Sequence, residues 1–227
     1  MHETSRVGDR PARDRWDMMD SSKSAYWDRY YAGAATASRP VPSQFAVFVA
    51  GELAEPHRIV EFGCGNGRDS LFFASNGHQV IGLDGSTSAI ERGSALADQF
   101  GEKVEFLAAD VNRSDLVDLI TDGGGRTVVY ARFFVHAITE DEQSAFLDTA
   151  ARLTKPGDLL AVEYRTVRDQ SGAKETGDHY RRFVSPAEFD HAAAQRGFTV
   201  QYAVEGFGFA KYKHDDAYVA RRVLART

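Results

Sequence analysis

One stretch, residues 58 to 84, constrains the fold of this chain more than any other. It opens with an apolar run that ends at Phe62, which suits a buried strand and is too short for a helix. Three glycines follow at alternate positions, where the backbone can adopt positive φ and approach a ligand closely. They are Gly63, Gly65 and Gly67. A helical segment and a second apolar run then lead to Asp84. The stretch predicts a strand, a glycine bend, a helix, a strand and a terminal acid, in that order.

This order is the layout of a nucleotide-binding half-fold. The bend meets the N-terminus of the predicted helix, where unpaired N–H groups and the helix dipole favour an anion. Asp84 ends the second strand, where a ribose-binding carboxylate is expected. A dinucleotide fingerprint, G-x-G-x-x-G, would need glycine at position 68, and the chain has Arg68 there. An oxidoreductase with a nicotinamide cofactor is therefore the weaker alternative.

The pattern E-x-G-x-G-x-G with an acid after the second strand resembles motif I of the class I S-adenosylmethionine-dependent methyltransferases. The run from Gly63 to Ser70 is most similar to bacterial small-molecule and glycan-pathway members, including the tellurite-resistance type. The resemblance covers roughly residues 23 to 227. It implies a Rossmann-like α/β fold with a mostly parallel seven-stranded sheet, an antiparallel last strand and helices on both faces. It also implies methyltransferase activity, with S-adenosylmethionine as the cofactor and S-adenosylhomocysteine as its product.

The resemblance also assigns cofactor contacts. Glu61 is expected to meet the methionine ammonium and Asp84 the ribose hydroxyls, while Asp110, after the third predicted strand, would bind the adenine amino group. Asp110 could instead be a turn residue, and Arg68 could pair with its neighbour Asp69 rather than reach the cofactor. The remaining predicted cofactor contacts are Tyr26, Trp27, Tyr31, Gly63, Cys64, Gly65, Asn66, Gly67, Arg68, Gly85, Ser86, Val111, Ala131, Arg132 and Phe133.

The N-terminal region has two parts. Residues 1–20 are polar and lack apolar periodicity, so we expect them to be disordered or loosely attached. Aromatic residues then recur at helical spacing between residues 23 and 31. This segment is either an amphipathic helix packed on the domain or a lid over the methyl donor, and both alternatives stay open.

The rest of the chain alternates predicted helices and strands in a single domain, residues 21–227. Predicted helices occupy residues 43–53, 86–100, 139–155 and 185–197, and predicted strands residues 104–107, 127–131, 159–162, 198–205 and 218–224. Capping boxes are expected at Ser88 with Glu91 and at Thr139 with Glu142. The closing hairpin resembles the end of the methyltransferase sheet, whereas dehydrogenase sheets of the Rossmann type are generally parallel throughout.

The methyl acceptor is expected at the ends of the fourth and fifth strands, because ligands bind there in doubly wound sheets. His136 is the candidate general base, since imidazole can remove a proton near neutrality; alternatively it bonds the following helix. Several arginines favour an anionic acceptor, because a guanidinium binds carboxylate or phosphate through two bonds, although a solvated basic loop is the alternative. The predicted acceptor contacts are Arg132, His136, Glu163, Arg165, His179, Tyr180, Arg181 and Arg182, and the acceptor loop spans residues 165 to 184.

Composition narrows the classes of partner. The net charge of −6 argues against nucleic acid, and no apolar run approaches the ~20 residues that span a bilayer. The N-terminus lacks a signal-peptide core and the single Cys64 permits no internal disulfide, so a cytoplasmic protein is expected. The histidines lack metal-ligand spacing, so no metal is expected. The predicted partner is a small molecule with a carboxylate, phosphate or sugar group. A non-catalytic protein that binds S-adenosylmethionine is the last alternative to an enzyme.

Overall fold

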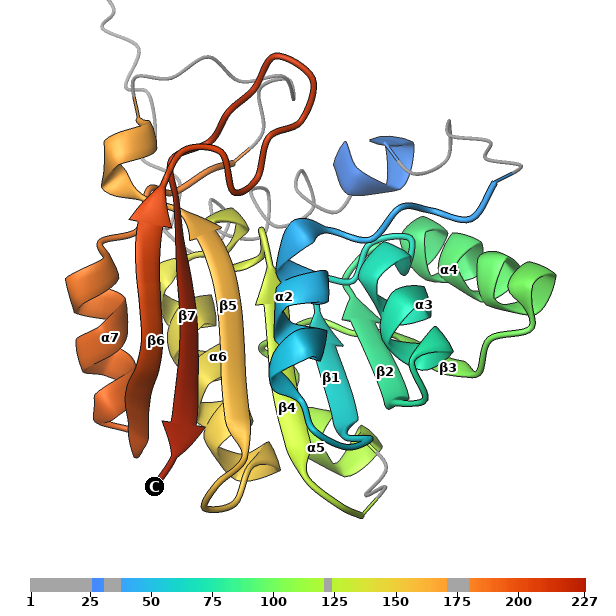
Figure 1. The fold of residues 1–227 in the computed structure, drawn as a ribbon, viewed down its shortest axis with the longest axis horizontal. Coiled ribbons are helices and arrows are strands. Elements are labelled where there is room, and N and C mark those ends of the chain that lie inside the picture. Colours follow the sequence, from blue (N-terminus) through green and yellow to red (C-terminus); the bar gives the residue numbers. More distant parts are fainter. Residues whose placement is uncertain (1–25, 31–37, 121–123, 171–179) are drawn as a thin grey trace, which may run out of the picture.

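The computed structural model describes residues 26–30, 38–120, 124–170 and 180–227, so the predicted tail at 1–20 lies outside the described residues. Its centre is a seven-stranded sheet in the order β3-β2-β1-β4-β5-β7-β6 (Figure 1). The strands are β1 (Arg58–Phe62), β2 (Gln79–Asp84), β3 (Val104–Ala108), β4 (Thr127–Arg132), β5 (Leu159–Arg165), β6 (Phe198–Gly206) and β7 (Val219–Arg226). Neighbours among β1 to β5 are parallel, whereas β7 is antiparallel to β5 and β6. The predicted mixed sheet is confirmed.

Helices cover both faces of this sheet. One face carries α2 (Gln44–Glu52), α3 (Arg68–Ser75) and α4 (Thr87–Phe100), and the other carries α5 (Leu116–Leu119), α6 (Glu140–Leu153) and α7 (Pro186–Ala194) (Figure 1). Short 3-10 helices follow β4 and β5 as η1 (Val135–Ala137) and η2 (Val167–Asp169). Residues 26–30 are helical and lie above the carboxyl ends of the parallel strands. Within the described ranges, no helix is both long and apolar enough to cross a membrane.

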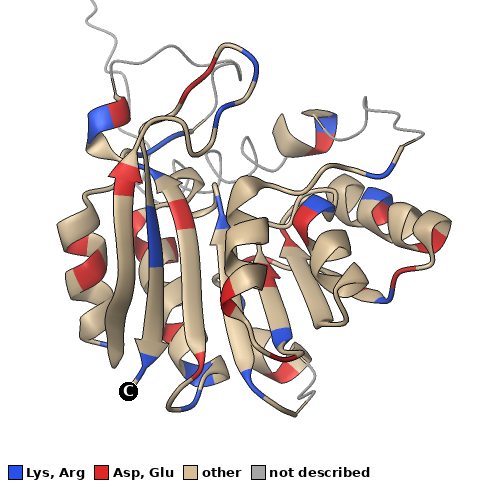
Figure 2. Cartoon of the chain, viewed as in Figure 1, with Lys and Arg blue, Asp and Glu red and all other residues tan. Residues whose placement is uncertain are grey.

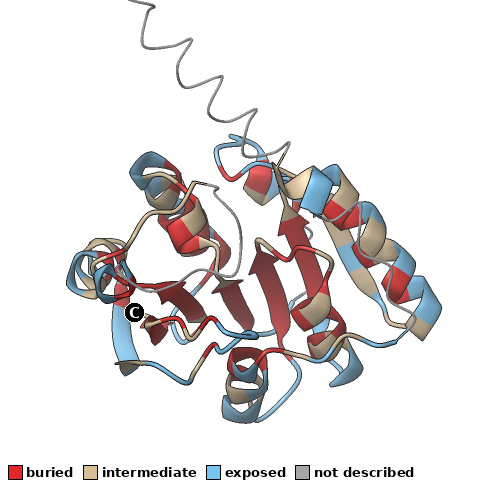
Figure 3. Ribbon diagram, turned by 90° about the horizontal axis from the view of Figure 1, so that it is seen from above, coloured by how far each residue is buried: buried red, intermediate tan, exposed pale blue. Residues whose placement is uncertain are grey.

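Two apolar layers hold the sheet between its helices. Ile59 and Val128 enter the layer under α2 and α3, while the adjacent Val60 and Val129 enter the layer under α6 and α7. The alternation follows from the two-residue repeat of a strand. β1 and β4 are buried along nearly their whole length (Figure 3), as expected for parallel strands covered on both faces. The carboxyl ends of these strands are therefore held by a well-packed part of the molecule.

The predicted helix starts agree with the structure, but only one of the two predicted capping boxes forms. Thr139 and Glu142 form both halves of the predicted capping box of α6. The capping box predicted for Ser88 is wrong, because Ser86 caps α4 instead, accepting the Ala89 N–H at 3.1 Å. The helix itself begins where the sequence predicts, at Thr87, because the Asp84 carboxylate accepts the Ser86 N–H at 2.9 Å and turns the chain directly from β2 into α4.

Candidate active site

A cavity of about 1090 Å³ lies at the carboxyl ends of the parallel strands. Its walls come from the glycine bend, the strand ends, the helical residues 26–30 and the loop between β6 and β7. The volume is sufficient for a nucleoside-sized ligand and a small second molecule. Acids predominate in one part of the cavity, which also contains Arg68, and bases predominate in the other, which also contains Glu142 and Asp215. We call the part with Glu61, Asp69, Asp84 and Asp110 the acidic half, and the part with Arg132, Arg165, Arg181 and Lys211 the basic half.

The bend in the acidic half requires glycine at two positions for steric reasons. Gly67 has φ +74°, and a Cβ there would lie 2.4 Å from the Phe106 ring. Gly63 has φ +68°, and a Cβ there would lie 2.8 Å from the Phe134 ring. Gly63 lines the cavity together with Cys64, Asn66 and Arg68, whereas Gly65 and Gly67 shape the bend from behind.

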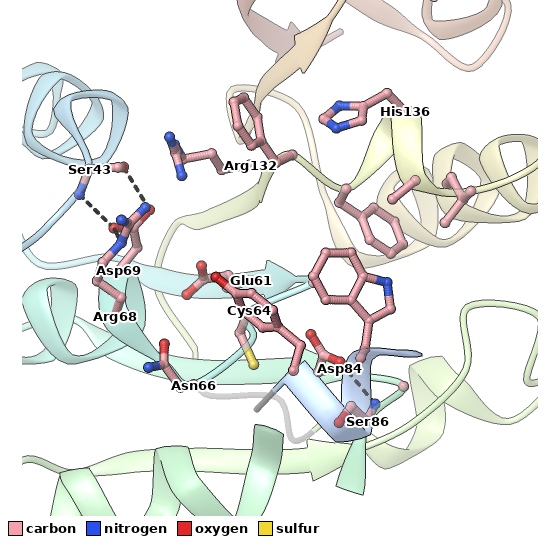
Figure 4. Close-up of a pocket in the computed structure, with 18 of the residues that line it drawn as sticks. Ser43, Glu61, Cys64, Asn66, Arg68, Asp69, Asp84, Ser86, Arg132 and His136 are labelled. Carbon is pink, nitrogen blue, oxygen red and sulfur yellow. Dashed lines mark hydrogen bonds and ion pairs between the residues drawn. The ribbon is translucent and has the colours of Figure 1, made fainter. Parts of the chain in front are cut away.

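Asp84 is held rigidly at the cavity wall (Figure 4). Its two carboxylate oxygens accept the backbone N–H of Gly65 at 2.8 Å and of Ser86 at 2.9 Å. Burial raises the pKa of Asp84, and the two N–H bonds act in the opposite direction. The carboxylate is thus fixed beside the bend, where the sequence predicts the ribose hydroxyls, and Gly85 and Ser86 line the cavity next to it.

Glu61 is a buried acid without a basic partner among its hydrogen bonds. It lines the cavity, and its Oε2 accepts a hydrogen bond from the Ser70 hydroxyl. Burial, and next the charge of Asp69, raise the pKa of Glu61 to about 8. A ligand cation would offset the cost of ionising this group. The methionine ammonium predicted for this position has the required charge.

Asp69 joins three elements behind the acidic half, a connection that the sequence did not reveal. It accepts the Ser43 N–H at 2.8 Å, the Ser43 hydroxyl at 2.6 Å and the Tyr130 hydroxyl at 2.9 Å. Arg68 Nε lies 3.4 Å from Asp69 Oδ1, which is the ion pair considered as one alternative for Arg68. The network fixes the start of α2 against α3 and β4, close to Glu61 (Figure 4).

The far end of the acidic half contains Asp110 and the aromatic segment. Asp110 and Val111 line the cavity, and Asp110 also accepts the Asn112 N–H at 2.7 Å, as a turn residue does. Trp27 lines the cavity as well, and Asp28 accepts the Ser86 hydroxyl at 2.6 Å, which ties residues 26–30 to the start of α4. Tyr26 packs edge-to-face on Trp27 outside the cavity lining, and Tyr31 lies outside the described residues.

Ala131 is the predicted cofactor contact whose side chain points farthest from the role assigned to it, and like Tyr26, Gly65 and Gly67 it is not part of the cavity lining. Its side chain is buried in the apolar layer between β4 and α6. The two residues after it do line the cavity. Phe133 adopts φ +58°, an unusual value for a residue other than glycine, and its N–H bonds the Glu163 carbonyl at 2.8 Å. This conformation places the ring at the wall, with Arg132 4.4 Å and Arg165 5.4 Å from its centroid.

Buried ion pairs support the basic half, where acidic and basic residues alternate near the upper ends of β4, β5 and β7 (Figure 2). Glu163 accepts Arg132 Nε at 2.8 Å and Arg221 Nε at 2.6 Å. The prediction that Glu163 contacts the acceptor is therefore wrong: its side chain is fully buried behind the cavity. The physical reason is the antiparallel strand β7, which brings Arg221 directly opposite Glu163.

Arg165 at the end of β5 and His136 in η1 both line the cavity and are hydrogen-bonded to each other. Arg165 lines the cavity but is engaged by two acids, Asp169 at 2.6 Å and Asp215. The N–H of Arg165 donates to Nδ1 of His136 at 3.1 Å. His136 is buried, lines the cavity and meets the Phe133 ring edge-to-face at 5.1 Å. Because Nδ1 accepts a hydrogen bond, the neutral ring carries its proton on Nε2.

The predicted acceptor loop contributes one described residue to the cavity. Arg181 lines it, and burial together with the charge of Arg165 lowers the pKa of Arg181. Arg182 does not line it: its Nη2 donates to Gln143 at 2.6 Å and its N–H to the His136 carbonyl at 2.7 Å, so it anchors the loop to η1 and α6. Tyr180 is outside the cavity lining, and His179 lies outside the described residues.

The sequence missed one wall of the basic half completely. The loop between β6 and β7 closes the cavity with Phe209, Ala210, Lys211, Tyr212 and Asp215. It was expected only as a connection between two strands. No local pattern marks these residues, because they reach the site only when the closing hairpin pairs with β5.

Comparison with known proteins agrees with this geometry. Residues 59–157 match the sequence profile of a family described as a methyltransferase domain. A similar fold occurs in a protein solved in work on the conversion of a disulfide bond into a thioacetal group during echinomycin biosynthesis, with 18% identity, TM-score 0.70 and 92% of each chain covered. The magnesium protoporphyrin IX methyltransferase of Synechocystis PCC 6803 with bound SAH has 18% identity and TM-score 0.63, with 94% of this chain and 100% of that chain covered. The CcbJ methyltransferase of Streptomyces caelestis has 20% identity and TM-score 0.67, covering 90% and 99%.

The sheet, the glycine bend and the acid facing it define a nucleotide-binding enzyme of the Rossmann-like class. The methyltransferase profile narrows that class: the chain is a class I S-adenosylmethionine-dependent methyltransferase, and S-adenosylmethionine is its cofactor. The residues present fit this group, since the cavity is lined by the carboxyl groups of Glu61 and Asp84, whose chemistry suits an ammonium group and ribose hydroxyls. The nicotinamide alternative is set aside by the profile match and by the antiparallel β7.

Proposed function

We propose that this methyltransferase transfers a methyl group to an oxygen, or a nitrogen, of a small polar acceptor that carries an anionic group. The observation that supports this most strongly is the division of one cavity into an acidic and a basic half. Acids at the ends of β1 and β2 suit the ammonium and ribose of the cofactor. Three arginines and Lys211 on the other side suit an anion.

The chain acts mainly by holding two reactants in line. The bound cofactor supplies an electrophilic methyl group on its sulfonium. Glu61 and Asp84 orient the cofactor, while Arg181 and Lys211 orient the acceptor from the opposite side of the cavity. Positioning and exclusion of water can provide most of the rate in such a displacement. Trp27 and Tyr30 from residues 26–30, with Tyr212 from the β6–β7 loop, line the cavity and limit the entry of water.

The test has two stages, so that cofactor binding and acceptor choice are read separately. Calorimetry with S-adenosylmethionine and S-adenosylhomocysteine should first show saturable uptake by folded protein. A screen that follows S-adenosylhomocysteine release would then compare hydroxy acids, amino acids and phosphorylated sugars with uncharged analogues of the same size. We expect turnover for anionic compounds. Preferential turnover of the uncharged analogues would overturn the proposal, as would the absence of cofactor binding.

A cytoplasmic location belongs to the same proposal. It is supported by the single, buried Cys64, since a chain with one cysteine forms no internal disulfide.

A further inference from the structure

We propose that the methylated atom is a carboxylate oxygen of the acceptor, and that His136 orients this carboxylate as an Nε2–H donor rather than acting as a general base. The inference rests on the proposed function and specifies its acceptor. It has three supports: the tautomer of His136, the engagement of the nearby acids and the charge of the basic half.

The first support is the hydrogen bond at His136. The backbone N–H of Arg165 donates to Nδ1 at 3.1 Å, and a backbone N–H cannot reverse its role. Nδ1 must therefore offer a lone pair, which places the proton of the neutral imidazole on Nε2. A ring in this tautomer has no lone pair on Nε2 with which to accept a proton from the acceptor. It can donate one hydrogen bond there, and an oxyanion is the strongest partner for that bond.

The second support is that the acids nearest the basic half already hold cations or N–H groups. Glu163 accepts Arg132 and Arg221, and Asp215 accepts Arg165. Asp169 accepts Arg165 and the Tyr218 N–H. Glu142 serves the capping box of α6. Among the described residues of this half, each acid thus has a structural role. Methylation of an alcohol or an ammonium group needs a base, whereas methylation of a carboxylate needs none.

The third support is the excess of positive charge. Arg132, Arg165, Arg181 and Lys211 line the basic half, against the two lining acids Asp215 and Glu142. Arg132 uses its Nε for Glu163, which leaves the two Nη groups as a fork that matches a planar carboxylate. The proximity of Arg165 and Arg181, whose like charges disfavour each other, makes an added anion stabilising.

The step balances without proton transfer. One carboxylate oxygen of the acceptor attacks the methyl carbon, and a C–O bond forms as the S–C bond breaks. The electron pair of the broken bond stays on sulfur, which becomes a neutral thioether, and the acceptor becomes a neutral methyl ester. His136 and the arginines hold the carboxylate in line during this exchange, and their own protonation does not change.

The tautomer can be measured without turnover. ¹⁵N-histidine NMR of the wild type, with the His136 signals assigned by their loss in His136→Asn, should show the shifts of an Nε2–H imidazole between about pH 7 and 8. An Nδ1–H tautomer would overturn the inference. The same spectra, recorded during titration of a carboxylate acceptor with S-adenosylhomocysteine present, should show a change at Nε2–H.

A matched pair of variants then separates donor from base. The glutamine amide of His136→Gln can place an N–H near the position of Nε2, while the oxygen of His136→Asn replaces Nδ1 and cannot reach as far. Neither amide is a base. We expect His136→Gln to retain kcat/KM within about tenfold of wild type and His136→Asn to lose about a hundredfold. The plot of kcat/KM against pH should show no titration of a catalytic histidine in either the wild type or His136→Gln. Equal loss of about a thousandfold in both folded variants would show that a base is required.

The acceptor class is tested by its product. Carboxylic acids should give methyl esters, detected by mass and by alkaline hydrolysis, while the matching primary amides and alcohols should stay unmodified. Methylation of alcohols, amines or phosphate monoesters in preference to carboxylates would contradict the inference and leave the methyltransferase assignment intact. Absence of cofactor binding would instead contradict the proposed function.

Discussion

The two halves of the cavity are assembled in different ways. The acidic half comes largely from one continuous stretch of the chain, β1 to α4. The basic half collects residues from the end of β4, the end of β5, the loop before α7 and the loop between β6 and β7. The acidic half is therefore determined mainly by one stretch of sequence, whereas the basic half depends on the pairing of strands that are distant in the sequence.

The halves also differ in how their charges are held. Backbone N–H groups of Gly65 and Ser86 fix Asp84, and these groups cannot move without a change in the bend itself. Arginine side chains hold the acids of the basic half, as Arg165 holds Asp169 and Asp215. Side-chain ion pairs can exchange partners as a ligand enters, whereas a backbone cradle cannot. We therefore expect the acidic half to keep its geometry when a ligand binds and the basic half to adapt.

The largest expected effect comes from the bend of the acidic half. Gly67→Ala adds a Cβ at φ +74° and 2.4 Å from the Phe106 ring, so strain and overpacking should together lower the free energy of unfolding by about 2–4 kcal/mol. Cofactor binding should fall below detection. Gly77→Ala is the matched control: Gly77 has φ +85° but no atom within 4 Å of an added Cβ. It should lose only about 1 kcal/mol and bind the cofactor normally. Equal losses in urea denaturation would show that the bend has no special packing.

The second prediction removes a charge from the same half. Asp84→Asn should weaken S-adenosylmethionine binding by about a hundredfold, roughly 3 kcal/mol, because two charge-assisted bonds to the ribose lose their ionised partner. Calorimetry measures this directly. Asp98→Asn makes the same change at an exposed position of α4 and should leave the Kd unaltered. A normal Kd for Asp84→Asn would remove the central assignment of the acidic half.

Local sequence predicted the acidic half because each of its requirements acts within a few residues. Glycines at 63 and 67, where φ is positive, and an acid at the end of β2 can each be recognised from the residue type and its position in the sequence. The basic half could be predicted only in part. The arginines and His136 were found at strand ends, but burial of Glu163 required knowledge that Arg221 lies opposite it. Lys211 lines the cavity because β6 pairs with β7 and the loop between them extends over the site. The two strands could be predicted from the sequence, but the position of their loop could not.

A third prediction concerns Glu61, the buried acid that is hydrogen-bonded to a serine rather than to an arginine. Glu61 has a pKa of about 8 in the folded protein against 4.5 unfolded, so between these values the folded state binds more protons than the unfolded state. Stability of the cofactor-free protein should therefore fall as the pH rises from about 5 to 8, by at most about 1.4 kcal/mol per pH unit, and level off above. Glu61→Gln should lack this slope. Denaturation of both proteins across that range measures it, with Glu91→Gln on the surface of α4 as control. Parallel curves for the wild type and Glu61→Gln would show that Glu61 is ionised in the free protein.

The smallest effect is expected where the site is most adaptable. Arg181→Ala should raise the acceptor KM about tenfold, equivalent to about 1.4 kcal/mol, because Arg132 and Lys211 can still bind the anion. The cofactor Kd should not change, since Arg181 lies in the basic half. Arg182→Ala is the matched control. The Arg182 guanidinium donates to Gln143 and to the Val135 carbonyl, so its removal should lower the free energy of unfolding and leave the acceptor KM nearly unchanged. If Arg181→Ala leaves the acceptor KM unchanged while cofactor binding holds, the loop is a solvated basic segment, and the anion must be bound by the strand-end residues alone.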